Sequence, residues 1–176
     1  LCSDGSVFLG MCAPTYAPKE TGGRFIGAGE QHTCALGFEG TARCWGNPDY
    51  TDPGALQYET GYFAIEAGRY HTCAINPDLK VECWGYSAWG QTTPPEDLNG
   101  AVDLALGANH SCALTHGGEV SCWGANSSGQ SSVPPDLTGV TQLSAGWWYT
   151  CAVHQDGEGG TPRVTCWGDT PNGFSS

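Results

Sequence analysis

The chain has 176 residues, of which 27 are glycine, 11 proline and 10 cysteine. Such a length allows one domain with a shared core. Its 18 acidic side chains outnumber its 6 basic ones and give a net charge of −12, which disfavours binding to nucleic acids and to anionic membranes. No apolar run is long enough to cross a bilayer, so we expect no membrane insertion within this chain.

The first 23 residues differ from the rest of the chain. They contain Cys2 and Cys12, which have nine residues between them, as do three later cysteine pairs. However, Ala13 and Pro14 follow in place of the Trp-Gly found after the later pairs, and no alternating strand precedes Cys2. We therefore expect residues 1–23 to be a partial, degenerate first repeat, and the chain to be a fragment of a longer protein.

Four fuller repeats follow, over residues 24–61, 62–100, 101–139 and 140–176. Each contains a form of the phrase Gly-x-x-His-Thr-Cys-Ala-Leu, which is altered most in the fourth copy, and each later contains Cys-Trp-Gly. The cysteines of the first phrase are 39 residues apart. Self-similarity at this period is typical of stacked units in propellers and solenoids, and it indicates a single repeat domain.

Within each repeat the pattern predicts short strands and no helix. An alternating segment comes first, as in Phe63, Ile65 and Ala67, and a hairpin between the two cysteines follows. The next segment could add a short outer strand, as at 91–93 and 130–133. Three or four antiparallel strands per repeat match the blade of a β-propeller, so the fold class is all-β, as a propeller or an arc of one.

The cysteine spacing predicts one disulfide per repeat. Opposed cysteines in an antiparallel hairpin lie within the Cα separation that a disulfide needs. Pairing Cys34 with Cys44 also sets Leu36 opposite Ala42. Zinc is disfavoured because structural zinc sites use more closely spaced cysteines. Disulfides indicate an oxidising compartment, so we expect a secreted, extracellular or cell-surface location. The expected pairs are Cys2–Cys12, Cys34–Cys44, Cys73–Cys83, Cys112–Cys122 and Cys151–Cys166.

These motifs, with Gly-Gln at Gly90-Gln91 and Gly129-Gln130, resemble the regulator of chromosome condensation repeat family. The resemblance covers about residues 25–168 and is closest to the extracellular, disulfide-bearing branch, found in secreted bacterial proteins and plant receptor ectodomains. It implies a β-propeller whose loops bind other proteins. The nuclear prototype is a nucleotide exchange factor, but the acidity and the cysteines argue against that activity here.

Residues that recur in every repeat are expected to be structural. His32, His71 and His110 share one position, taken by Tyr149 in the fourth copy, and we expect each imidazole to hydrogen-bond a neighbouring backbone carbonyl. The tryptophans of Cys-Trp-Gly are expected to pack between blades. The sequence indicates no metal site and no cofactor.

The two residues between the motif glycine and the histidine vary among the repeats. Variable residues on a fixed loop are typical of a binding surface, and Trp, Tyr and Arg are enriched at interface hot spots. The alternative is that Trp147 or Trp148 fills space beside an irregular fourth blade. The predicted partner-binding residues are Arg69, Tyr70, Asn109, Trp147, Trp148 and Tyr149.

Asn109 and Asn126 lie in glycosylation sequons and are candidate glycan sites. Together these features favour a non-catalytic extracellular protein-binding module, whose partner is a protein or a neighbouring subunit of a larger receptor, adhesive or appendage assembly. The alternative is a carbohydrate-binding module that uses exposed Trp and Tyr. An enzyme is disfavoured because no free cysteine, Gly-x-Ser-x-Gly or His-Glu-x-x-His is present.

Overall fold

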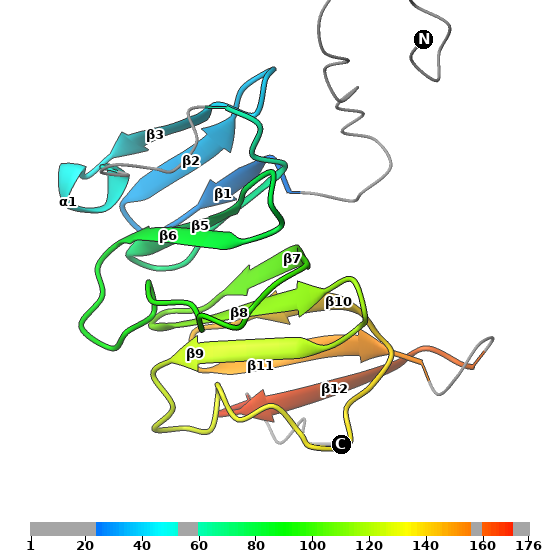
Figure 1. Ribbon diagram of the computed structural model, residues 1–176. Coiled ribbons are helices and arrows are strands. Elements are labelled where there is room, and N and C mark those ends of the chain that lie inside the picture. The colour runs from blue at the N-terminus through cyan, green and yellow to red at the C-terminus, as the bar shows by residue number, and fades with distance from the viewer. Residues whose placement is uncertain (1–23, 53–59, 156–159, 171–176) are drawn as a thin grey trace, which may run out of the picture.

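The computed structural model describes residues 24–52, 60–155 and 160–170. In these residues the chain forms four three-stranded antiparallel sheets, each built from strands consecutive in sequence (Figure 1). We call these sheets blades 1 to 4. Their strands are β1 (Ile26–Ala28), β2 (His32–Leu36) and β3 (Ala42–Gly46); β4 (Ala64–Ala67), β5 (His71–Ile75) and β6 (Val81–Gly85); β7 (Ala101–Leu106), β8 (His110–Thr115) and β9 (Val120–Gly124); β10 (Val140–Ala145), β11 (Tyr149–His154) and β12 (Arg163–Gly168).

The hairpin register is the one that the cysteine spacing predicts. Leu36 pairs with Ala42, and Cys34 lies opposite Cys44. Four disulfides join the second and third strands of the four blades, with Cα separations of 4.0 to 4.1 Å. The one-disulfide-per-blade prediction is thus confirmed in blades 1 to 4, while the Cys2–Cys12 pair lies outside the described residues.

The blades pack face to face in chain order. The first strands β1, β4, β7 and β10 contact one another in succession and so lie nearest the axis of the arc. Three apolar clusters lie between neighbouring blades: Cys34 with Ile65 and Trp84, Ile75 with Leu104 and Trp123, and Leu114 with Leu143 and Trp167. Each sheet thus buries its apolar face against the next, as expected of repeats that cannot form a core alone.

Two expectations about the links between blades are wrong. The segments at 91–93 and 130–133 form turns and not outer strands, because the carbonyls of Gln91 and Gln130 point at the next blade and bond its side chains. The link after blade 1 contains a four-residue helix, α1 (Pro48–Thr51), although no helix was expected. Asn47 caps it by accepting a hydrogen bond from the Asp49 amide, and Pro48 opens its first turn.

Trp45 also departs from the expected packing between blades. Its side chain is 54% exposed, whereas Trp84, Trp123 and Trp167 are 5 to 7% exposed. The difference follows from position. Among the described residues, no blade precedes blade 1 to cover the face on which Trp45 lies. The described residues contain no helix long and apolar enough to span a membrane.

Candidate functional site

The recurring histidines connect each blade to the next. The Nε2 atom of His32 lies 2.9 Å from the Thr72 hydroxyl of blade 2, and His71 and His110 make the same contact to Ser111 and Thr150. The partner is therefore a hydroxyl group of the following blade, not the backbone carbonyl that we expected. A structural role for these histidines fits this geometry.

The hydroxyl groups fix which nitrogen of the ring carries the proton. The Ser111 hydroxyl donates to the Gln91 carbonyl at 2.8 Å, and the Thr150 hydroxyl donates to the Gln130 carbonyl at 3.1 Å. A hydroxyl has one proton, so each must accept from the imidazole that contacts it. His71 and His110 are thus neutral rings protonated on Nε2. Their Nδ1 atoms are buried with no partner among the described residues.

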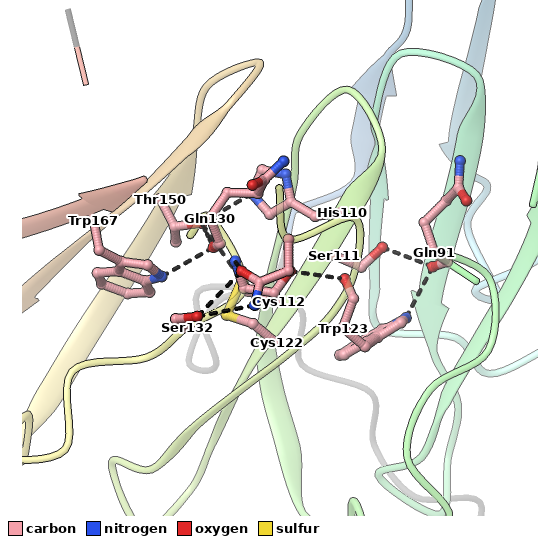
Figure 2. The surroundings of a disulfide bond; sticks show 12 residues. Gln91, His110, Ser111, Cys112, Cys122, Trp123, Gln130, Ser132, Thr150 and Trp167 are labelled. Atoms are coloured by element: carbon pink, nitrogen blue, oxygen red, sulfur yellow. Dashed lines mark hydrogen bonds between the residues drawn. A yellow bond between two sulfur atoms is a disulfide. The ribbon is translucent and has the colours of Figure 1, made fainter. Parts of the chain in front are cut away.

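The same two carbonyls also accept a bond from the Cys-Trp-Gly tryptophans. The Trp123 indole donates to the Gln91 carbonyl at 2.8 Å, and the Trp167 indole donates to the Gln130 carbonyl at 3.0 Å (Figure 2). Gln91 and Gln130 are fully buried, and sequence reasoning assigned them no role. The recurrence of Gly-Gln within the link that follows Cys-Trp-Gly was the signal that could have identified them.

Burial keeps the histidines uncharged. It lowers the pKa of His71 to about 3 and the pKa of His110 to about 4, and it lowers the pKa of His32 as well. A charged ring would lose its hydration, and its Nδ1 has no hydrogen-bond partner among the described residues. His71 and His110 are therefore neutral near pH 7.

The motif glycine is required by close packing at the axis. A Cβ atom on Gly68 would lie 2.4 Å from the His71 ring and 2.5 Å from the Gly107 carbonyl oxygen of the next blade. The equivalent atom on Gly146 would lie 2.3 Å from the Tyr149 ring, which occupies the place of the histidine in blade 4. Any side chain here would push the blades apart.

The variable pairs follow these glycines, and their backbone is held between blades. The amide of Glu30 donates to the Arg69 carbonyl, that of Arg69 to the Gly107 carbonyl, and that of Ala108 to the Trp147 carbonyl, at 3.1 to 3.2 Å. Because the main chain is fixed in this way, the side chains at these positions can differ without disturbing the fold. They surround one end of the axis.

Arg69 is the centre of a side-chain cluster at this rim. Its guanidinium group bonds both carboxylate oxygens of Glu30 and lies 4.6 Å from the centre of the Tyr70 ring and 4.7 Å from that of Trp147. The Tyr70 hydroxyl donates to Glu30 at 3.2 Å, and the Arg69 guanidinium lowers the pKa of Glu30. The cluster joins residues of blades 1, 2 and 4.

Two further tyrosines extend the cluster. The Tyr50 ring of α1 lies 5.0 Å from that of Tyr70, and the Tyr86 ring lies 6.3 Å away in an edge-on arrangement. Tyr50 follows β3 and Tyr86 follows β6, the third strands of blades 1 and 2. The chain just after each of these strands is hydrogen-bonded to a variable loop, as the Tyr86 amide is to the Tyr70 carbonyl. We call Tyr50, Arg69, Tyr70, Tyr86 and Trp147 the aromatic rim. Sequence reasoning placed Glu30 in a variable pair without naming it as a binding residue, and it missed Tyr50 and Tyr86 because their proximity to Tyr70 depends on the fold.

The other predicted residues lie around this rim with different surroundings. Trp148 is 38% exposed. Asn109 is half-buried, and its carbonyl accepts from the Ala125 amide. Tyr149 is half-buried against Gly146. Asn126 is exposed, and its amide group exchanges hydrogen bonds with Ser132.

An open hollow lies on the axis inside the rim. It has a volume of about 420 Å³ and is lined by small residues of all four blades, with Glu30, Arg69 and Trp147 at its mouth and Glu66 among its walls. Beyond it, Arg24 donates to Glu66 at 3.1 Å and to the Leu143 carbonyl at 3.1 Å. In the described part of the chain no group of three or more His, Cys, Asp or Glu is placed to hold a metal.

Blade-like sheets, a disulfide in each and a shared axis define an arc of a β-propeller. The pattern of the Regulator of chromosome condensation (RCC1) repeat matches residues 24–51, 101–130 and 140–174, which together make up just over half of the chain. The chain therefore belongs to the RCC1 repeat family. No individual curated protein matches the sequence.

Solved structures agree with this assignment. The CRINKLY WD40 ectodomain of the Arabidopsis thaliana receptor kinase ACR4 matches 81% of this chain, with a TM-score of 0.65 and 27% identity. The ectodomain of the Physcomitrella patens receptor kinase CR4 matches 85%, with a TM-score of 0.65 and 25% identity. Prp20p from Saccharomyces cerevisiae, whose binding to Gsp1p and histones is described, shares the fold over 81% of this chain, with a TM-score of 0.65 and 19% identity. The chain spans 49%, 41% and 44% of these structures.

Proposed function

We propose that this chain is a non-catalytic, extracellular protein-binding module that engages its partner through the aromatic rim. The observation that carries this proposal is the fixed position of Arg69. Its guanidinium is held by Glu30 and by two aromatic rings on an exposed surface. Arg, Tyr and Trp are the residue types enriched at binding hot spots, and a side chain that is already ordered loses less entropy on binding.

The backbone at the rim supports this role. The loops are fixed between blades by hydrogen bonds, while the residue types on them change from repeat to repeat. This division suits a rigid scaffold that presents variable side chains. Four disulfides, and similarity at 25 to 27% identity to two receptor ectodomains, favour an extracellular location.

A matched pair of tryptophans provides the test. Trp147 and Trp89 are both 56% exposed, but of these two described tryptophans only Trp147 contacts Arg69. The wild-type protein, Trp147→Ala and Trp89→Ala would each be immobilised and exposed to extracellular fluid of the source organism. The proteins that the wild type retains would be identified. The affinity of each immobilised protein for such a partner would then be measured by surface plasmon resonance. We expect a partner that Trp147→Ala binds about 30-fold more weakly, since a hot spot is worth about 2 kcal/mol or more.

In this experiment Trp89→Ala should bind like the wild type. Equal losses in the two variants would mean that exposed aromatic area, and not the aromatic rim, determines the binding. If no protein is retained and a glycan array instead gives binding that Trp148→Ala abolishes, the carbohydrate-binding alternative replaces this proposal.

A further inference from the structure

The axial hollow has the dimensions and lining of a binding site. Its volume of about 420 Å³ falls within the range of small-ligand pockets. Most of its lining residues are small, such as Ala28, Ala67, Ala108 and Ala145, and they leave the hollow open. It opens at the aromatic rim, between Glu30, Arg69 and Trp147.

The charges around the hollow do not balance. At the rim, Glu30 is compensated by Arg69. Deeper along the axis, two carboxylates, Glu66 and Asp103, share the single guanidinium of Arg24, at 3.1 and 3.8 Å. Counting these five groups leaves one excess negative charge on the axis.

Glu66 retains a free acceptor. Its Oε1 atom accepts from Arg24, while its Oε2 atom has no hydrogen-bond partner among the described residues. Its side chain is only 17% exposed, and burial raises the pKa of Glu66, as it raises that of Asp103. A carboxylate with one oxygen left without a partner among the described residues gains a charge-assisted hydrogen bond from a cation that reaches it.

We propose that the axial hollow binds one basic side chain, lysine or arginine, of the protein partner, with Glu66 as the acceptor of its charged end. Arg24 already demonstrates this mode of binding within the molecule. It contacts Glu66, Asp103 and the Leu143 carbonyl, one group on each of the three other blades. The partner's side chain would enter from the aromatic rim and pass its aliphatic stem along the alanine walls.

The chemistry of the site selects against other ligands. An acidic side chain would meet the excess negative charge and a protein of net charge −12. An apolar side chain would fill the hollow but leave Glu66 without a new partner. Glu30 is a poorer acceptor for the entering group because both of its oxygens already bond Arg69 and one also accepts from Tyr70.

This inference rests on the proposed binding role of the aromatic rim, but it can be tested without the partner. The probe is Nα-acetyl-lysine N-methylamide, titrated into isotope-labelled protein while the backbone amide resonances are followed by NMR. We expect saturable shifts at the amides of Gly68, Gly107 and Gly146 that weaken as salt is raised. The uncharged analogue, Nα-acetyl-norleucine N-methylamide, should produce shifts only at about tenfold higher concentration, because it makes no charged hydrogen bond.

Three variants define the site. Glu66→Gln should weaken the lysine probe about tenfold. Because that change also removes a partner of Arg24, Ala145→Leu provides a second route by filling the hollow, and it should abolish the shifts. Ser144→Leu is the matched control on the same strand, since Ser144 is exposed and is not among the residues that line the hollow. It should bind like the wild type.

The possible failures are distinguishable. Absence of saturable shifts in the wild type, equal binding of the norleucine analogue, or unchanged binding in Ala145→Leu would overturn the inference and leave a Trp147-dependent partner unaffected. If lysine binds as expected but Trp147→Ala retains the partner, the hollow is a basic-ligand site and the proposed function fails.

Discussion

The spaces between the blades and the aromatic rim differ in how their polar groups are satisfied. Between blades, the same imidazole, hydroxyl, carbonyl and indole groups meet in successive repeats, all buried. At the rim, one ion pair and several aromatic rings lie partly exposed on loops whose residues change from repeat to repeat. The difference indicates that the buried network maintains the fold and leaves the rim free to specialise.

Free energies follow the same division. A buried hydrogen-bonding group that loses its partner incurs a desolvation cost of about 1 to 3 kcal/mol. Exposed ion pairs and cation–π contacts contribute about 1 kcal/mol or less. Substitutions between blades should therefore affect stability most, and substitutions at the rim should affect binding most.

The largest effect is expected for Trp123→Ala. Trp123 is 7% exposed and donates its indole proton to the Gln91 carbonyl, so its loss leaves a cavity and removes one of the two side-chain hydrogen bonds that this carbonyl accepts. We expect the free energy of unfolding to fall by about 3 to 5 kcal/mol in denaturant titrations. Trp45→Ala, at the same repeat position but 54% exposed, should lose about 1 kcal/mol or less. Equal losses would show that exposure does not separate the two positions.

Those tryptophans also show how far the sequence could predict the fold. Repeat spacing predicted the four disulfides and the pairing of Leu36 with Ala42, because an antiparallel hairpin with opposed cysteines has a fixed register. It did not predict that Trp45 is exposed. That depends on which blade covers which face, a property of the whole arc.

The candidate site was only partly predictable for a related reason. The residues between the motif glycine and the histidine were identifiable because they vary within a constant frame, and Arg69, Tyr70 and Trp147 do meet at the rim. Tyr50 was not, since it lies on a short helix in a link and approaches Tyr70 only in the folded chain. Long-range juxtaposition of this kind leaves no local sequence pattern.

Removing one disulfide should have the next largest effect. The Cys73 and Cys83 pair is separated by 10 residues, and replacing both with Ala should lower the free energy of unfolding by about 2 to 3 kcal/mol, mainly through the unfolded state. The Cys151 and Cys166 pair closes a longer segment of 15, so its removal should cost only a few tenths of a kcal/mol more. A change of less than about 0.5 kcal/mol in both would show that the bridges do not limit the unfolded chain.

Acid should weaken the contacts between blades, and the expected loss of stability per pH unit is smaller than the loss on removing a disulfide. The unfolded chain protonates its histidines below about pH 6.5, whereas His71 and His110 in the folded chain do so only near 3 and 4. Stability contributed by the neutral rings is therefore complete above pH 6.5 and declines as pH falls towards 4. Each ring should contribute a slope of at most about 1.4 kcal/mol per pH unit.

The His110→Gln variant isolates this contribution. Glutamine can still donate to Thr150 but does not titrate, so its stability between pH 6.5 and 4.5 should decline less steeply than that of the wild type, by up to one histidine's slope. The comparison also removes the opposing effect of Glu66 and Asp103, whose pKa values burial raises, because the variant retains both carboxylates. Identical slopes in the two proteins would contradict the buried, neutral state of His110.

The smallest effect on stability is expected at the rim itself. Trp147 is 56% exposed, and its contact with Arg69 is an exposed cation–π pair, so Trp147→Ala should lower the free energy of unfolding by about 1 kcal/mol or less. Trp148→Ala, at 38% exposure, should behave similarly. Denaturant titrations of both variants and of Trp123→Ala would show which of these tryptophans contribute to the packing between blades and which belong to the aromatic rim. If Trp147→Ala unfolded as readily as Trp123→Ala, Trp147 would belong to the packing of blade 4 and its assignment to the binding surface would be wrong. If it retained its stability while losing its partner, the rim would be free to change its ligand without risk to the fold.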